Sequence, residues 1–122
     1  MQIHGREVGL RLTMRATLDI AKLTPHESID EIGDVLGAAT FAGQLELIVR
    51  FIAALSRGYE EAKRYEEPGY VPNPVTEEEL LSLDMTDLNQ LQNEAFAAFN
   101  RDTQTEVEVK ESKKEDAPPA SA

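Results

Sequence analysis

The sequence predicts a small, mainly α-helical domain with an N-terminal β-hairpin and a disordered C-terminal tail. Apolar residues recur at helical spacing through most of residues 14–100, and a short alternating stretch precedes them. Residues 101–122 contain only Val107 and Val109 as apolar residues larger than Ala, which is too little to offset the entropy of ordering. We therefore expect one helical domain over residues 1–100 and a disordered acidic tail over residues 101–122.

The hairpin is predicted from the first twelve residues. Residues 8–12 alternate apolar and polar side chains, as in a strand with one buried face. Ile3 belongs to a shorter strand before it, and His4-Gly5 lies between them, where Gly5 adopts the positive φ that a tight turn requires. Because an isolated hairpin is only marginally stable, its apolar face is expected to cover helices.

A first helix is predicted over residues 14–23, with the Thr13 hydroxyl capping its first turn. Its apolar face is formed by Met14, Leu18 and Ala21, with Ile20 as a further candidate. Thr24-Pro25 ends this helix because proline clashes with the preceding turn.

A second helix is expected to begin with a capping box, in which Ser28 and Glu31 satisfy each other's backbone groups, and to end at Gly37. Its apolar stripe is formed by Ile29, Ile32 and Leu36.

The strongest helical signal covers residues 38–56, where apolar residues recur at steps of four and three. The apolar arc is wider than the roughly 100° of an ordinary surface helix, so packing on two sides is expected. Gly58 is predicted to end or interrupt this helix. The predicted core of the domain is Phe41, Leu45, Ile48, Ile52, Leu55, Leu88 and Leu91.

Prolines punctuate residues 67–75, which predicts an extended loop. Thr76 and Glu79 form a second predicted capping box, which opens a short acidic helix. A last helix restarts at Asp84 or Thr86. It carries Leu88, Leu91, Ala95, Phe96 and Phe99.

The charge is strongly acidic: 12 Lys and Arg against 23 Asp and Glu give a net charge of −11. Residues 25–100 hold four of the bases and 15 of the acids. Such a surface repels phosphate, which argues against nucleic acid or an anionic membrane as a partner and favours a basic or mixed one. No apolar run approaches the length of a membrane-spanning helix and no signal-peptide pattern is present, so a cytoplasmic location is expected.

The sequence offers no constellation for catalysis. His4 is interpreted as a turn residue and His26 as a residue of a helix-start loop, without partners for nucleophilic chemistry. Asp30, Glu31 and Asp34 lack the ligand spacing of a calcium loop, so helix-start positions explain them better. We expect no catalytic residue, no cofactor site, no metal site and no enzymatic activity.

Apolar surface beyond the needs of one small core is the feature that remains. Leu47 and Phe51 lie at one edge of the central helix arc, where a helix of a partner or of a second copy would dock. Tyr59 and Tyr70 flank the proline-rich loop. These four residues are predicted to make partner contact, and Leu47→Asp or Phe51→Asp is expected to abolish binding while leaving the fold intact.

Three segments carry a resemblance to a known family: residues 3–13 (I-x-G-x-x-x-x-L-R-L-T), residues 15–21 (RATLDIA) and residues 74–84 (PVTEEELLSLD), followed by a charged low-complexity C-terminus. In this order they resemble the tail assembly chaperones of long-tailed bacteriophages. The resemblance implies a non-enzymatic role in the cytoplasm of the infected bacterial host. There the chain would bind and solubilise the aggregation-prone tape measure protein and help tail tube subunits assemble around it. It also implies a longer product made by a ribosomal frameshift.

Two other functions are compatible with the same residues. A virion structural component, at the head-to-tail junction or in the tail tube, would form symmetric rings and persist in finished particles. A small acidic adaptor or inhibitor would bind one basic target tightly, with its acidic tail ordering on the complex.

Overall fold

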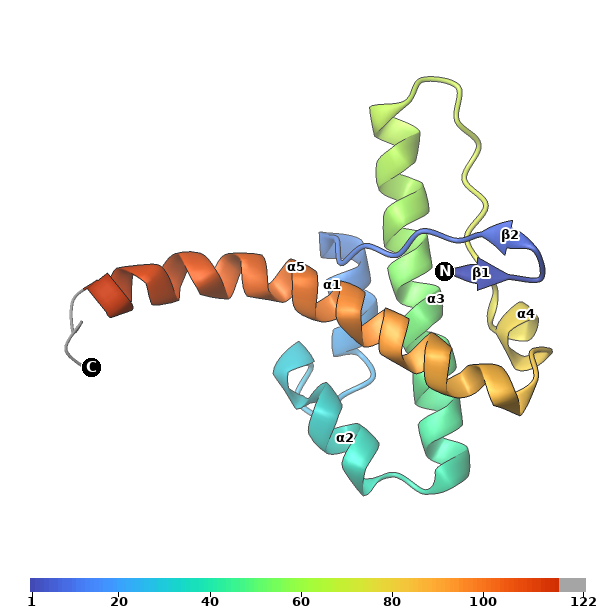
Figure 1. The fold of residues 1–122 in the computed structure, drawn as a ribbon, viewed down its shortest axis with the longest axis horizontal. Coiled ribbons are helices and arrows are strands. Elements are labelled where there is room, and N and C mark those ends of the chain that lie inside the picture. The colour runs from blue at the N-terminus through green and yellow to red at the C-terminus, as the bar shows by residue number, and fades with distance from the viewer. Residues whose placement is uncertain (117–122) are drawn as a thin grey trace.

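The computed structural model describes the backbone of residues 1–116 and the side chains of residues 1–103. It is mainly helical with a short N-terminal hairpin, as the sequence predicts (Figure 1). A long central helix, α3, runs through the body, and the other helices pack around it. The helices and strands are β1 (Gln2–Ile3), β2 (Arg6–Glu7), α1 (Met14–Ala21), α2 (Ile32–Ala38), α3 (Phe41–Glu66), α4 (Glu77–Leu81) and α5 (Leu88–Asp116), with 3₁₀ turns η1 (Ile29–Glu31) and η2 (Met85–Asp87).

The predicted turn at His4-Gly5 is confirmed. Both residues have positive φ, 49° and 81°, as a two-residue hairpin turn requires. The two strands pair antiparallel, and the side chain of Ile3 in β1 is fully buried.

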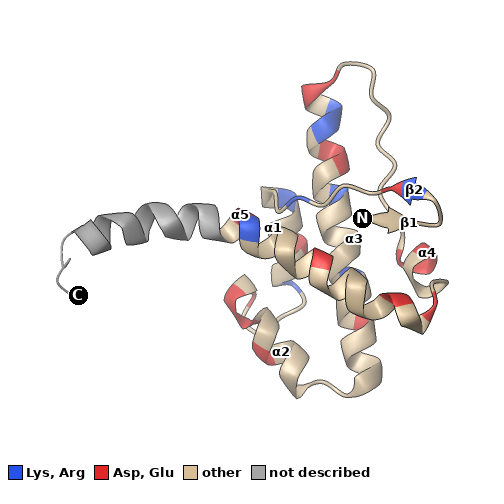
Figure 2. Ribbon diagram, viewed as in Figure 1, with Lys and Arg blue, Asp and Glu red and all other residues tan. Residues whose placement is uncertain are grey.

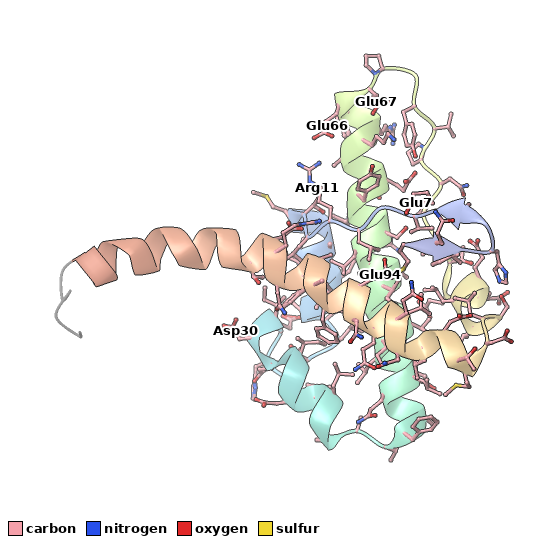
Figure 3. All side chains as sticks on the ribbon, viewed as in Figure 1. Glu7, Arg11, Asp30, Glu66, Glu67 and Glu94 are labelled. Carbon is pink, nitrogen blue, oxygen red and sulfur yellow. The ribbon has the colours of Figure 1, made fainter. Side chains whose placement is uncertain are left out.

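The predicted strand over residues 8–12 is wrong, because the chain leaves the sheet after Glu7. It then crosses α3 in extended form: the Arg11 backbone N–H donates to the Leu55 carbonyl at 3.1 Å, and the Arg11 side chain pairs with Glu66 at 3.0 Å (Figure 3). The alternating pattern is satisfied by a helix surface, which buries Val8, rather than by a partner strand.

The Thr13 cap of α1 is confirmed, since its hydroxyl accepts from the Ala16 N–H at 3.2 Å. The predicted apolar face is wrong at Met14 and Leu18 and confirmed at Ile20. Met14 is 89% exposed and Leu18 is 62% exposed, whereas Ala16 and Ile20 are buried. Ala16 and Ile20 therefore face the body, and Met14 and Leu18 face outward.

Gly58 explains this orientation. It neither ends nor interrupts α3, which continues to Glu66. A Cβ at Gly58 would lie 2.6 Å from the Thr13 hydroxyl and 3.0 Å from the Ala16 Cβ. The absence of a side chain at Gly58 thus allows α1 and the segment before it to approach α3 closely.

The capping box predicted for α2 does not form. The Ser28 side chain makes no cap hydrogen bond, and the Glu31 carboxylate accepts instead from the His26 N–H at 3.1 Å, with the His26 ring Nδ1 at 2.6 Å. This interaction lowers the pKa of Glu31. The helix also runs one residue past Gly37, to Ala38.

The predicted core is largely confirmed. Ile48, Ile52, Leu55 and Leu91 are buried, and Leu45 and Leu88 are half-buried. Phe41 is the correction: it is 63% exposed because it lies in the first turn of α3, at the end of the helix that extends beyond α4 and α5 (Figure 1).

The predicted loop over residues 67–75 is confirmed, and polar groups of α3 hold it. The buried Ser56 hydroxyl accepts from the Val75 N–H at 2.9 Å, and the buried Glu60 carboxylate accepts from the Asn73 N–H at 2.9 Å. These contacts place Thr76 so that α4 begins beside α3.

The helix α5 crosses α3 and continues past the predicted domain boundary at residue 100. The Asp102 carboxylate accepts from the Leu12 N–H at 2.7 Å, and the Arg101 guanidinium donates to the Leu10 carbonyl at 3.0 Å. The folded body therefore extends to at least residue 102. Most of the predicted disordered tail, residues 101–122, lies outside the described side chains. Within the described chain, no helix is long and apolar enough to cross a membrane.

Candidate partner-binding surfaces

Partner contact is predicted for Leu47, Phe51, Tyr59 and Tyr70. These four residues do not form one surface in the structure. The prediction for Phe51 is wrong. It is 1% exposed, because α5 crosses α3 there and brings the rings of Phe96 and Phe99 to 4.8 and 5.3 Å from it. Leu47 is half-buried on α3 and lies outside the groove described below.

The two tyrosines contact parts of their own chain. The Tyr59 ring occupies the space over Gly9, where any side chain would clash with it. The Tyr70 hydroxyl donates to the Glu60 carboxylate, and this bond and burial raise the pKa of Tyr70 to about 12. The Lys63 ammonium lies 4.8 Å from the Tyr70 ring and 5.7 Å from the Tyr59 ring. Both side chains thus fasten extended segments to α3.

An open apolar groove lies where α3, α4, η2 and α5 meet, and we call it the α4 groove. It encloses about 100 Å³. Two large apolar side chains at the groove stay exposed, Leu81 at 62% and Met85 at 57%. Its lining residues are Leu45, Ile48, Val49, Ile52, Leu80, Leu81, Leu83, Asp84, Met85, Leu88 and Leu91.

Local sequence explains why Leu81 stays outside. The capping box predicted at Thr76 and Glu79 is confirmed, and it fixes the start of a helix that is only five residues long. The pKa of the Glu79 carboxyl lies below its usual value, chiefly because the Thr76 N–H donates to it. The nearby Arg6 guanidinium lowers this pKa further. Leu80 is buried in the core. Since neighbouring residues on a helix point about 100° apart, Leu81 cannot share that core position.

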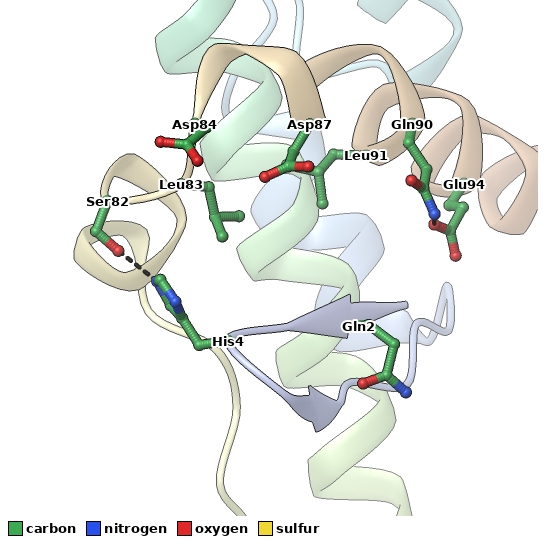
Figure 4. Close-up of a pocket in the computed structure, with 9 residues that line it drawn as sticks. All are labelled: Gln2, His4, Ser82, Leu83, Asp84, Asp87, Gln90, Leu91 and Glu94. Carbon is green, nitrogen blue, oxygen red and sulfur yellow. Dashed lines mark hydrogen bonds between the residues drawn. The ribbon is translucent and has the colours of Figure 1, made fainter.

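A polar pocket adjoins the groove on the hairpin side, and we call it the hairpin pocket (Figure 4). It has a volume of about 380 Å³. The His4 ring bridges its two sides, with Nε2 2.7 Å from the Ser82 hydroxyl. Its lining residues are Gln2, His4, Ser82, Leu83, Asp84, Asp87, Gln90, Leu91 and Glu94.

The groove and the pocket are continuous and acidic. They share Leu83, Asp84 and Leu91. Residues 77–94 contain six acids and no Lys or Arg, and Figure 2 shows acidic residues gathered over α4 and the start of α5. Arg50 of α3 lies 3.9 Å from both Glu46 and Glu77.

A second apolar groove lies on α1, and we call it the α1 groove. It measures about 470 Å³. Its lining residues are Leu12, Met14, Thr17, Leu18, Ile29, Asp102 and Thr103. Asp102, its acidic residue, is already engaged by the Leu12 N–H and by Arg101 at 2.8 Å. Among the described residues that line the α1 groove, the one carboxylate is thus already engaged, whereas Asp84 at the α4 groove is exposed.

Sequence reasoning missed Leu81, Met85, Met14 and Leu18 as exposed apolar residues. Only the exposure of Leu81 could have been predicted from the sequence, because two adjacent leucines in a very short helix cannot both face one core. Met14 and Leu18 are spaced as a core face is, so their exposure depends on the contact at Gly58.

Among the residues whose side chains are described, no three His, Cys, Asp or Glu side chains are placed to hold a metal ion. The acids of the hairpin pocket face an open cavity, and apolar side chains flank them. Such an arrangement suits a ligand with apolar and cationic groups side by side.

Comparisons of this chain with models of protein families, with curated proteins and with solved structures give no match.

Proposed function

We propose that this chain is a tail assembly chaperone of a long-tailed bacteriophage, which acts in the host cytoplasm and binds the tape measure protein as tail tube subunits assemble around it. One observation carries the proposal: Leu81 and Met85 remain exposed beside an open apolar groove in a body whose core is complete without them. The resemblance over residues 3–13, 15–21 and 74–84 gives the same function.

The proposed role of this chain is to keep an aggregation-prone partner in solution. A very long helical protein with exposed apolar stripes aggregates unless those stripes are covered. A small partner with an open apolar groove and a net charge of −11 covers the stripe and adds repulsion between the coated chains. Each copy buries a modest area, so many copies must bind, and each must exchange fast enough to leave as the tube closes.

Co-expression tests this function. A tape measure protein from the genome that encodes this chain is expressed with and without it, and its soluble fraction and the co-purified stoichiometry are measured. We expect solubility to depend on this chain and several copies to co-purify with each partner. If the partner stays insoluble and this chain is found in purified particles, the chaperone proposal fails and a virion structural role replaces it.

A further inference from the structure

We infer that the α4 groove and the hairpin pocket together form a docking surface for a basic amphipathic helix. Its apolar side chains enter the groove, and its Lys or Arg side chains face the carboxylates of the pocket. The inference rests on the proposed function and specifies the face of the chaperone and the chemistry of the partner segment.

The walls of the α4 groove provide an apolar seat for a helix. Ile48 and Ile52 are buried at its base, while Leu81 and Met85 are more than half exposed at it. All residues lining the groove except Asp84 are apolar, so burial of a partner's apolar side chains is favoured there. A helix laid along it would cover both exposed side chains.

The hairpin pocket provides the carboxylates that would face the basic side chains of the helix. Asp84, Asp87 and Glu94 line it, and no Lys or Arg is among its lining residues. Glu94 lies 3.6 Å from the N-terminal ammonium group, whereas Asp84 and Asp87 are exposed. Asp84 also lines the apolar groove, so a cation one helical turn from a seated apolar side chain lies close to a carboxylate.

A second copy of this chain fits the surface poorly. A two-fold contact would bring the same acidic patch of both copies together, at a net charge of −11 per chain. Juxtaposed like charges oppose such association. Charge complementarity therefore selects a basic partner, and it selects the α4 groove over the α1 groove.

Two labelled peptides test the inference with the full-length chain. Each is a helical peptide of about 18 residues with the same Leu stripe, flanked by Lys in one peptide and by Glu in the other. Fluorescence anisotropy measures binding. We expect the Lys peptide to bind at least about tenfold more tightly than the Glu peptide, and its affinity to fall as salt is added.

Variants of the chain locate the site. Leu81→Glu and Met85→Glu are each expected to weaken the Lys peptide at least about tenfold. Asp87→Lys is expected to weaken the Lys peptide and strengthen the Glu peptide. The matched controls are Met14→Glu and Leu18→Glu, which place the same charge beside the α1 groove and should leave binding unchanged. Circular dichroism verifies that each variant is folded.

The inference is overturned if the wild-type chain does not bind the Lys peptide or binds the two peptides equally. It is also overturned if the α1 groove variants lose binding while the α4 groove variants retain it. The same variants in the co-expression assay separate the two proposals. Rescue by the wild-type chain and equally by Leu81→Glu rejects this face and keeps the chaperone function. Selective peptide binding without any rescue rejects the chaperone function and keeps the face.

Discussion

The two halves of α3 are covered in different ways. Extended backbone and α1 cover the C-terminal half: residues 8–13 cross it and lead into α1, which packs at Gly58. Residues 67–75 lie on another side, where Ser56 and Glu60 accept hydrogen bonds from the loop. Helices cover the N-terminal half, where α4 and α5 pack through aliphatic and aromatic side chains. Figure 1 shows the descending loop and the crossing helix α5 on these two parts of α3.

The difference indicates how the chain separates stability from recognition. An extended segment follows the helix surface closely, and buried polar partners hold it in one position. Two convex helices that cross leave a gap beside the crossing point, and the gap is lined with apolar side chains. Extended segments held by buried polar groups therefore cover the C-terminal half of α3, whereas the N-terminal half presents the α4 groove.

The largest expected effect is at the crossing of α3 and α5. Phe51→Ala removes a ring that is 1% exposed and stacks on Phe96, so it is expected to lower the free energy of unfolding by about 3–5 kcal/mol. Urea denaturation followed by circular dichroism measures this loss. The control is Phe41→Ala in the same helix, where the ring is 63% exposed and a loss below about 1 kcal/mol is expected. Equal losses at both positions would show that α5 does not pack across Phe51.

The next effect tests the close approach over the C-terminal half. Gly58→Ala places a Cβ 2.7 Å from the Arg11 carbonyl, and such overpacking costs about 1–3 kcal/mol. The gain of about 1 kcal/mol in helix propensity offsets part of this cost. Gly37→Ala in α2 is the control, since its Cβ meets nothing within 4 Å, and it is expected to be stabilising. Thermal denaturation measures the stability of both variants. A higher midpoint for Gly58→Ala than for the wild type would contradict the observed contact of α1 with α3.

The parts of the fold that could be predicted are those that neighbouring residues determine. The His4-Gly5 turn, the Thr13 cap and the Thr76–Glu79 capping box each depend on groups within a few residues, and all three form. The capping box at Ser28 fails for a local reason that the pattern did not weigh, since His26 provides a competing partner for Glu31.

The parts that could not be predicted depend on contacts between distant residues. The outward turn of Met14 depends on Gly58, which is 44 positions later in the sequence, and the burial of Phe51 depends on the path of α5. The wide apolar arc of α3 correctly predicted packing on two sides. It did not predict which edge of the arc stays exposed, because that depends on the paths of the other helices. The α4 groove consists of residues from α3, α4, η2 and α5, so no single periodicity shows it.

A smaller effect concerns the loop, residues 67–75, that covers one side of the C-terminal half. The hydrogen bond to Glu60 raises the pKa of Tyr70 from 10.0 to about 12, so the folded state holds this proton more tightly than the unfolded state does. The resulting stability is fully present below pH 10 and is lost as the pH rises through about 12. Absorbance titration of tyrosinate is expected to show a late step that Tyr70→Phe removes. A late step that persists in Tyr70→Phe would assign it to another tyrosine.

The smallest effect on stability is expected where the N-terminal half of α3 is open, and the adjacent leucines of α4 provide the comparison. Leu81→Ala shortens a side chain that is 62% exposed, so the free energy of unfolding should change by no more than about 0.5 kcal/mol. Leu80→Ala, one residue earlier and 4% exposed, should cost about 2–5 kcal/mol. Urea denaturation of the two variants measures both values. If Leu81→Ala destabilises the chain as much as Leu80→Ala, Leu81 belongs to the core and the groove is not open. If Leu81→Ala does not change the free energy of unfolding, the Leu81 side chain of the wild type is exposed to water without contributing to folding. A partner surface requires such an apolar side chain.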